Sequence, residues 1–555
     1  MKVLFLRQKF DWVQDGAKIT PTGMTVRHVD MALSEFFDDQ RLSDLAEQFI
    51  HCEKPDVLVI PVFLGNPTDY NGFRLAMHVR LTEAPGFKQP HIVLLASESN
   101  DEFHTHCPYI RFLQTDKVSY VDYDHTVITG HLENLKLGTE EYQIENNLQY
   151  FDINKPHADD DHHNIDSKLA LLNWSEAIGC IDELNHLRKR FGNQLHFKES
   201  ALTTRHHVRI TNETATTFRE GKHKILLIDD KAEDGWSIFF QSLFSSSQIN
   251  FSHLEFSSLS NNSEEIVKRA SEQVSETDPD VIILDLRLCD SDAEATNTDQ
   301  ELTGIRILRK IKAFNRGIQV IVLSASNKIW NLKPAYDLGA RECIVKNPYD
   351  RHALKQLRIS LDESTRLYRF YKTIYTRLSR LKTLIQLDNN TSLGFKDSAL
   401  NSLTVGYDLI EMSEVESNYI NYAYLHLYKL IEDWVEEYTV TEPSKKRKKF
   451  SIIKGQKVDV LSGEDSKISY SINHRRYIEK PGKYSLKKPV DTNFKMSALL
   501  IYVLEGTHKN WRKVNQVRNN KCGHANQNKE FVTTEELLKL IDFLDFIFET
   551  TKTDF

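Results

Sequence analysis

Several side chains that could take part in phosphoryl chemistry each end a short apolar run in the middle of the chain. Asp229 and Asp230 end the first run, Asp285 the second, Ser324 the third and Lys346 the fourth. Clustered carboxylates repel one another and favour a divalent cation, and Mg²⁺ takes oxygen ligands. A carboxylate can attack a phosphoryl group as a nucleophile, while a metal ion and a lysine neutralise charge on the transferring oxygens.

The elements that must position these residues are strands and helices in alternation. The apolar runs are continuous, which is typical of buried parallel strands, and helical periodicity fills the gaps, for example over residues 304–311. This alternation predicts a doubly wound, flavodoxin-like parallel sheet, whose site lies at the carboxyl ends of the strands. We expect Asp229 and Asp230 to hold Mg²⁺ beside the nucleophile Asp285, with Ser324 and Lys346 contacting the phosphoryl group.

These five residues, in this order and each at a strand end, resemble the site of the response-regulator receiver (CheY-like) family. The alternative is a plain flavodoxin-like domain with chance acids, which five matching positions disfavour. The resemblance implies that residues 222–360 form a phosphoacceptor receiver domain of a two-component phosphorelay. It further implies that Asp285 is the phosphoacceptor, that Mg²⁺ is the cofactor, and that a sensor histidine kinase is the partner.

The chain departs from the family pattern in two places. An acidic, polar insertion follows Cys289 and delays the glycine-led helix to Gly304, and we expect it to form a flexible flap near the site. The flap either modulates partner access or is a neutral surface loop. Cys343 stands where the family often places a switch aromatic, so the usual aromatic–hydroxyl coupling is not expected.

A degenerate copy of this pattern occupies residues 1–130, hereafter the first repeat, residues 222–360 being the second. Residues 2–9 align without a gap on 224–231, and residues 55–61 align on 279–285. Every chemical position differs: the acidic pair is replaced by Arg7 and Gln8, the acceptor by Pro61, the hydroxyl by Leu95 and the lysine by Asp122. We expect a pseudo-receiver that docks or dimerises; an unrelated α/β domain is the alternative.

Residues 131–221 are predicted to be a helical and irregular connector. Its run of His and Asp at residues 157–163 could bind a metal, but the sequence favours a solvated loop because no regular element orders the ligands. The residues from about 165 to 191 have a helical pattern.

Residues 361–555 are predicted to form an all-helical domain with a basic insertion at 441–490 and no helix-turn-helix for DNA. Arg518, Asn519 and His524, late in this domain, resemble the motif of the HEPN family, many of whose members are dimeric, metal-independent ribonucleases. The resemblance implies that Arg518 binds the scissile phosphate and His524 shuttles a proton. Alternatively, the motif is a surface helix end terminated by Gly523 and His524.

The composition fits a water-soluble multidomain protein: 555 residues, 40% hydrophobic, 27% charged and a formal charge of -8. The six scattered cysteines form no CxxC pair and indicate a reducing compartment. No apolar run approaches the roughly 20 residues that span a bilayer, and the start lacks a signal-peptide pattern, so we expect a cytoplasmic protein without membrane contact.

Together these features predict a cytoplasmic response regulator that controls a HEPN-like endoribonuclease, is a homodimer and acts on RNA. The HEPN resemblance alone implies a role in antiviral defence. The alternative is a non-catalytic signalling protein or phosphate sink whose helical domain docks a separate effector. Transcription control through the basic region is a third hypothesis, which the missing DNA-binding domain disfavours.

Overall fold

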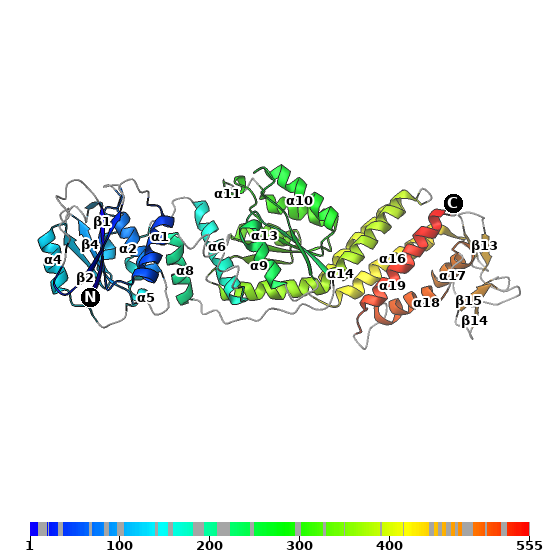
Figure 1. The fold of residues 1–555 in the computed structure, drawn as a ribbon. Coiled ribbons are helices and arrows are strands. Elements are labelled where there is room, and N and C mark those ends of the chain that lie inside the picture. The colour runs from blue at the N-terminus through cyan, green and yellow to red at the C-terminus, as the bar shows by residue number, and fades with distance from the viewer. Residues whose placement is uncertain are drawn as a thin grey trace. The chain divides into compact units, whose positions relative to one another are not determined.

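The computed structural model describes most of the chain (Figure 1). It describes residues 1–8, 19, 21–31, 37–65, 69–82, 88–96, 105–138, 142–153, 159–180, 194–207, 222–244, 249–294, 301–325, 329–348, 350–388, 391–414, 416–442, 449–452, 458–461, 468–471, 476–479, 492–504, 508–522 and 530–553. These residues divide into two compact units, 1–308 with 320–363 and 309–319 with 364–555.

The first repeat is built on a five-stranded sheet in the order β2-β1-β3-β4-β5. Its strands are β1 (Lys2–Gln8), β2 (Thr25–Met31), β3 (Val57–Pro61), β4 (His91–Ala96) and β5 (Val118–Asp122), and its helices are α1 (Asp39–Gln48), α2 (Asn71–Leu81) and α4 (His125–Asn134). All five residues of β3 are buried, because helices cover both faces of the sheet (Figure 1).

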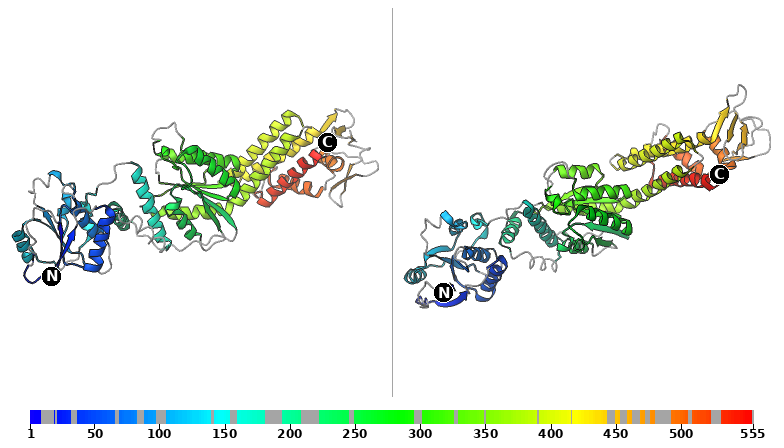
Figure 2. Two further views of the ribbon diagram at one scale, coloured as in Figure 1. Left: turned by 45° about the horizontal axis from the view of Figure 1, so that its top comes forward. Right: turned by 90° about the horizontal axis from the view of Figure 1, so that it is seen from above.

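The second repeat has the same topology, with strand order β7-β6-β8-β9-β10. Its strands are β6 (His223–Ile228), β7 (Ile249–His253), β8 (Val281–Leu284), β9 (Gln319–Ser324) and β10 (Glu342–Val345), and its helices are α9 (Trp236–Leu243), α10 (Ser263–Thr277), α11 (Ser291–Glu294), α12 (Thr303–Phe314) and α13 (Ile329–Asp337). Figure 2 shows this sheet, in green, between its helices. The doubly wound parallel sheets predicted from the sequence are therefore confirmed.

The two repeats agree in strand register. Val3 pairs with Val57 in the first sheet as Ile225 pairs with Val281 in the second. The backbone N–H of Lys2 donates to Asp56 Oδ2 at 2.7 Å, and in the second repeat the corresponding N–H of residue 224 donates to the carboxylate of residue 280 at 2.9 Å. The first strands of the two repeats, aligned from the sequence, therefore also share this hydrogen bond.

The connector is divided between the cores of the two repeats. It contains α5 (Ile144–Asn147), α6 (Asp159–Ala177) and α8 (Leu195–His207). Leu195 and Leu202 of α8 lie in the core of the first repeat, whereas Trp174 of α6 packs edge-on against Trp236 of the second repeat. Residues 159–163 were expected in a solvated loop, but they form the first turns of α6. Residues 157 and 158 lie outside the described part of the chain.

The C-terminal part is mainly helical, as predicted. Its helices are α14 (Arg351–Leu387), α15 (Leu393–Met412), α16 (Tyr419–Tyr438), α17 (Thr492–Tyr502), α18 (His508–Val517) and α19 (Thr534–Thr553), and they share one apolar core. The short strands β11 (Thr439–Glu442), β12 (Lys449–Ile452), β13 (Val458–Leu461), β14 (Ile468–Ser471) and β15 (Arg476–Glu479) form two antiparallel sheets. Of the basic insertion, residues 443–448, 453–457, 462–467, 472–475 and 480–490 lie outside the described residues. Within the described helices, none is long and apolar enough to cross a membrane.

Candidate functional site

The candidate phosphoacceptor site lies at one edge of the second sheet. Asp229 and Asp230 follow β6, Asp285 follows β8 and Lys346 follows β10. Because parallel strands end at the same edge of a sheet, three separate parts of the chain meet there. We call Asp229, Asp230, Asp285 and Lys346 the acceptor cluster.

Lys346 connects two of the carboxylates. Its Nζ donates to Asp229 Oδ2 at 2.7 Å and to Asp285 Oδ2 at 2.8 Å. Burial by itself would lower the pKa of Lys346, but the two carboxylates outweigh it and raise that pKa above the ordinary lysine value. Lys346 is therefore a permanent cation against the candidate nucleophile, and its charge is almost completely shielded from water, with 1% of the side chain exposed.

The three carboxylates that the sequence predicts as metal ligands lie close together. One oxygen from each of Asp229, Asp230 and Asp285 lies within 4.8 Å of the others. Burial, followed by the charges of Asp229 and Asp285, raises the pKa of Asp230 to about 7. This mutual repulsion and the all-oxygen donor set fit Mg²⁺, which would relieve the repulsion while keeping several waters.

The backbone around Asp285 is tightly held. The N–H of Leu286 donates to Asp285 Oδ1 at 2.6 Å, which leaves Oδ2 to face Lys346. A Cβ on Gly304 would lie 2.3 Å from the carbonyl oxygen of Asp285, so only glycine fits where α12 begins. The site thus orients its acceptor carboxylate before any phosphoryl donor arrives.

Part of the predicted flap is ordered by Asp292, whose importance the sequence reasoning missed. Its Oδ1 accepts from both the N–H and the hydroxyl of Thr303 at 2.9 Å, and its Oδ2 accepts from the N–H of Leu288 at 2.8 Å. Asp292 is 4% exposed. A helix-capping acid placed eleven residues before its helix gives no local sequence signal; residues 295–300 of the flap lie outside the described part.

The remaining predicted residue, Ser324, is buried at the end of β9, where its carbonyl accepts from the N–H of Lys346 at 2.8 Å. Two neighbours were not anticipated. The indole ring of Trp236 lies 5.0 Å from Lys346 Nζ, and the N–H of Cys343 donates to the hydroxyl of Tyr336 at 3.2 Å. An aromatic hydroxyl therefore contacts the last strand from α13, although the strand itself carries none.

The corresponding edge of the first sheet is chemically different. Arg7 forms an ion pair with Asp30 at 2.7 Å, Leu95 is 1% exposed, and Asp122 lies exposed at the end of β5. Pro61 ends β3 and offers no side-chain ligand. This edge therefore lacks both the carboxylates and the lysine of the acceptor cluster.

The HEPN-like residues are only partly described. Arg518 and Asn519 lie in a π-helical turn, Arg518–Cys522, directly after α18, and His524 lies outside the described residues. The guanidinium of Arg518 lies 5.6 Å from the ring of Tyr428 and 3.8 Å from Glu432. Arg518 also donates to Asn519 Oδ1 at 3.0 Å.

Two family models match the repeats. One, described as "Inactive Receiver domain", matches residues 24–121, and the other, described as "Response regulator receiver domain", matches residues 261–358 and so includes Asp285, Ser324 and Lys346. The chain carries two receiver domains. The degenerate repeat inferred from residues 1–130 is thus confirmed as the inactive receiver domain.

Solved receiver-containing structures are similar to about a quarter of the chain. They include a two-component response regulator of the LuxR family from Aurantimonas sp. SI85-9A1, with 16% identity, 26% of this chain and 86% of that chain covered, and a TM-score of 0.19. The receiver domain of a LuxO-type repressor from Vibrio parahaemolyticus has 20% identity, coverages of 26% and 94%, and a TM-score of 0.19. That of NarL from Mycobacterium tuberculosis has 16% identity, coverages of 26% and 98%, and a TM-score of 0.19. A comparison with curated proteins finds no significant match.

Proposed function

We propose that the second receiver domain accepts a phosphoryl group on Asp285 from a partner histidine kinase in a two-component phosphorelay. The observation that carries this proposal is the acceptor cluster, in which Lys346 contacts the candidate nucleophile while three carboxylates converge on one point. We further propose that Asp229, Asp230 and Asp285 hold Mg²⁺, which when bound neutralises charge on the transferring phosphoryl oxygens.

In the proposed reaction, a carboxylate oxygen of Asp285 forms a bond to phosphorus while the bond from phosphorus to the donor's imidazole nitrogen breaks. The N–H of Leu286 holds the second carboxylate oxygen and so limits rotation of the nucleophile. Lys346 lies beside the developing negative charge, and burial strengthens its attraction. Ser324 then donates its hydroxyl to the new phosphoryl group.

We propose that α12 carries the signal. The helix begins at Thr303, beside the acceptor loop, and its residues from Arg309 onward belong to the second compact unit. Within that unit, Arg316 donates to Asp408 Oδ1 at 2.7 Å and also pairs with Glu411. Phosphorylation would divert Lys346 from its two carboxylates, and a shift at the start of α12 would then pass along the helix toward Arg316, which follows the helix end at Phe314.

The proposed output is the C-terminal helical domain, with RNA cleavage at Arg518, Asn519 and His524 as the leading hypothesis and a defence role as its extension. The Arg518 side chain is 33% exposed, so a phosphate could reach part of its guanidinium. We also propose that the protein is homodimeric, since the HEPN resemblance implies that two protomers share the catalytic cleft. A cytoplasmic location is proposed as well.

The second candidate function is non-catalytic signalling, in which the helical domain docks an effector and the receiver acts as a phosphate acceptor or sink. The ion pair between Arg518 and Glu432 favours this candidate, because a nearby carboxylate opposes binding of an anionic RNA backbone. The two candidates differ in one measurable property, which is RNA cleavage.

The test combines phosphorylation with RNA cleavage in the full-length protein. Mass spectrometry should place the phosphoryl group from acetyl phosphate and Mg²⁺ on the peptide containing Asp285, and Asp285→Asn should abolish it; label that survives this substitution overturns the acceptor assignment. Cleavage should be lost in Arg518→Ala and in His524→Ala but kept in Lys513→Ala, a matched exposed cation on α18. If the wild type cuts no RNA in either phosphorylation state, the nuclease hypothesis fails and the docking function remains.

A further inference from the structure

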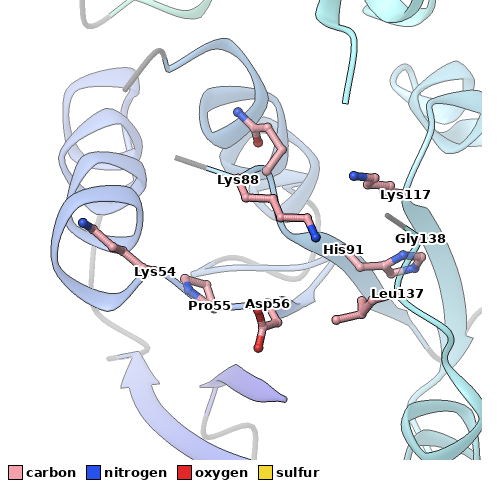
Figure 3. A pocket seen from close by; sticks show the side chains of 9 residues that line it. Lys54, Pro55, Asp56, Lys88, His91, Lys117, Leu137 and Gly138 are labelled. Atoms are coloured by element: carbon pink, nitrogen blue, oxygen red, sulfur yellow. The ribbon is translucent and has the colours of Figure 1, made fainter. Parts of the chain in front are cut away.

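A pocket of about 230 Å³ opens at the edge of the first sheet opposite the degenerate acceptor positions (Figure 3). We call it the cationic pocket, and it is lined by Lys54, Pro55, Asp56, Lys88, Gln89, His91, Lys117, Leu137 and Gly138. Most of these residues lie where β3, β4 and β5 begin. The pocket is therefore separate from the edge at which the active receiver carries out its chemistry.

The lining of the cationic pocket is predominantly positive. It includes three lysines and one acid. Figure 3 shows the Lys88 amine directed toward His91, whereas the Lys54 amine points away from it. The single acid, Asp56, already accepts the backbone N–H of Lys2 at 2.7 Å. Lys88 and Lys117 thus contribute the charge that a ligand would meet.

A buried arginine holds together the two segments that supply these lysines. Arg80, 2% exposed, donates to the carbonyl of Pro90 at 2.9 Å and to the carbonyl of Lys117 at 2.8 Å. A buried cation is costly unless it is well compensated. Arg80 therefore both anchors the pocket wall and adds positive potential behind it.

The positive potential behind the pocket wall affects the protonation of His91. Its Nε2 lies 3.0 Å from the hydroxyl of Ser119, which in turn lies 3.0 Å from Nε2 of His131. Burial, then the charges of Arg80, His131 and Lys117, lower the pKa of His91 to about 4. His91 is consequently neutral near pH 7, so it can offer a ligand a hydrogen bond while the lysines supply the positive charge.

The backbone of Lys117 is unusual in a way that the second receiver does not share. Lys117 has φ of 58°, in the left-handed region that side chains rarely adopt, whereas its counterpart Arg341 is not among the described residues with positive φ. Lys54 also has positive φ, 45°, but so does its counterpart Asp278, so that conformation belongs to both repeats. The turn at Lys117 is therefore a local difference between the two repeats, whereas the turn at Lys54 is shared.

The repeat itself provides an internal comparison for the pocket. By the alignment of Ile92 with Ile321, Lys88 corresponds to Gly317 and His91 to Val320. A Cβ on Gly317 would lie 2.4 Å from the backbone nitrogen of Lys372, so chain backbone covers that position in the second repeat. Within the described residues, the second repeat therefore has no space for a lysine side chain at the position that corresponds to Lys88.

We propose that the inactive receiver domain binds a small phosphate-bearing anion in the cationic pocket, between Lys88 and Lys117. At roughly 30 Å³ per water, the pocket has the volume of seven or eight waters, and it is smaller than the roughly 300–1,000 Å³ of sites for drug-sized ligands. Inorganic phosphate or a sugar phosphate matches this size. A domain that has lost phosphoryl transfer would then sense a phosphorylated small molecule at its opposite edge.

Isothermal titration calorimetry on the full-length protein tests this proposal, with inorganic phosphate and glucose 6-phosphate as probes. EDTA removes divalent metal ions, so the acceptor cluster keeps its negative charge and repels an anionic probe. The ionic strength is held constant in all titrations. The wild type should bind at least one probe, and Lys88→Ala combined with Lys117→Ala should weaken binding at least tenfold. Lys136→Ala, an exposed lysine near the pocket but outside its lining, should bind as the wild type does.

A second variant separates pocket binding from general attraction to lysines. Leu137→Trp keeps both lysines but fills the mouth of the pocket, since Leu137 is 38% exposed there, and it should also abolish binding. Unchanged hydrogen exchange of the β3 peptide in each variant would show that the first receiver domain still folds. Three outcomes would each overturn the proposal: no binding by the wild type, binding by the double variant equal to that of the wild type, or a loss in Lys136→Ala equal to that of the double variant. None of these outcomes bears on phosphorelay function.

Discussion

The replacement Asp230→Asn should stabilise the second receiver domain at alkaline pH when no metal is present. In the folded protein the pKa of Asp230 is raised from 3.8 to about 7, first by burial and then by Asp229 and Asp285. The folded state therefore binds this proton more tightly than the unfolded chain does. The resulting penalty is absent below about pH 4, grows as the pH rises, and is complete above about pH 7.

The magnitude follows from the same shift. A change from 3.8 to about 7 corresponds to about 4 kcal/mol, at roughly 1.36 kcal/mol for each tenfold change in proton affinity. The raised pKa already includes the attraction of the Lys231 amine, 3.1 Å away, but Asp230 keeps 28% of its side chain exposed, so solvent screens part of the penalty. We therefore expect Asp230→Asn to stabilise the domain by about 2 kcal/mol at pH 8.

Hydrogen exchange measured by mass spectrometry on the full-length protein provides the assay. In EDTA at pH 8, the peptide covering β8 should exchange roughly thirtyfold more slowly in Asp230→Asn than in the wild type. The difference should vanish near pH 4, and Mg²⁺ should slow exchange in the wild type. The β3 peptide of the inactive receiver is the internal control and should not change. A pH-independent difference, or faster exchange in the variant at pH 8, would refute the electrostatic reasoning.

Two further predictions concern the loop that carries the acceptor. Gly304→Ala places a Cβ 2.3 Å from the carbonyl oxygen of Asp285, and Gly72→Ala places one 2.1 Å from that of Pro61 in the first repeat. Each variant should destabilise its own domain by about 1–3 kcal/mol in denaturant titrations, but only Gly304→Ala should slow phosphorylation. Equal slowing by both variants would contradict this geometry. Asp292→Ala removes the acceptor of buried N–H groups and should lower the free energy of unfolding by about 1–3 kcal/mol. Hydrogen exchange should become faster only in residues 286–304. Unchanged exchange there would show that Asp292 does not order the flap.

The main features of the fold and of the acceptor cluster could be predicted from the sequence because they are local patterns. Each candidate residue of the cluster follows a continuous apolar run, and parallel strands place such ends together whatever the rest of the chain does. The same argument identified the first repeat, whose strand register matches that of the second. The expectation of a loop at residues 159–163 failed because packing of α6 on the second receiver overrides a polar local sequence.

Long-range packing decided the features that no local pattern reveals. Asp292 caps α12 across an insertion, Trp236 covers Lys346, and Arg80 joins two loops to form the wall of the cationic pocket. Each of these contacts depends on side-chain direction and burial, which a linear sequence does not encode at any single position. The sequence by itself therefore determined which residues are capable of phosphoryl chemistry and in which order they occur. Only the tertiary structure decided how their charges balance, because electrostatic energies depend on distance and on exclusion of water.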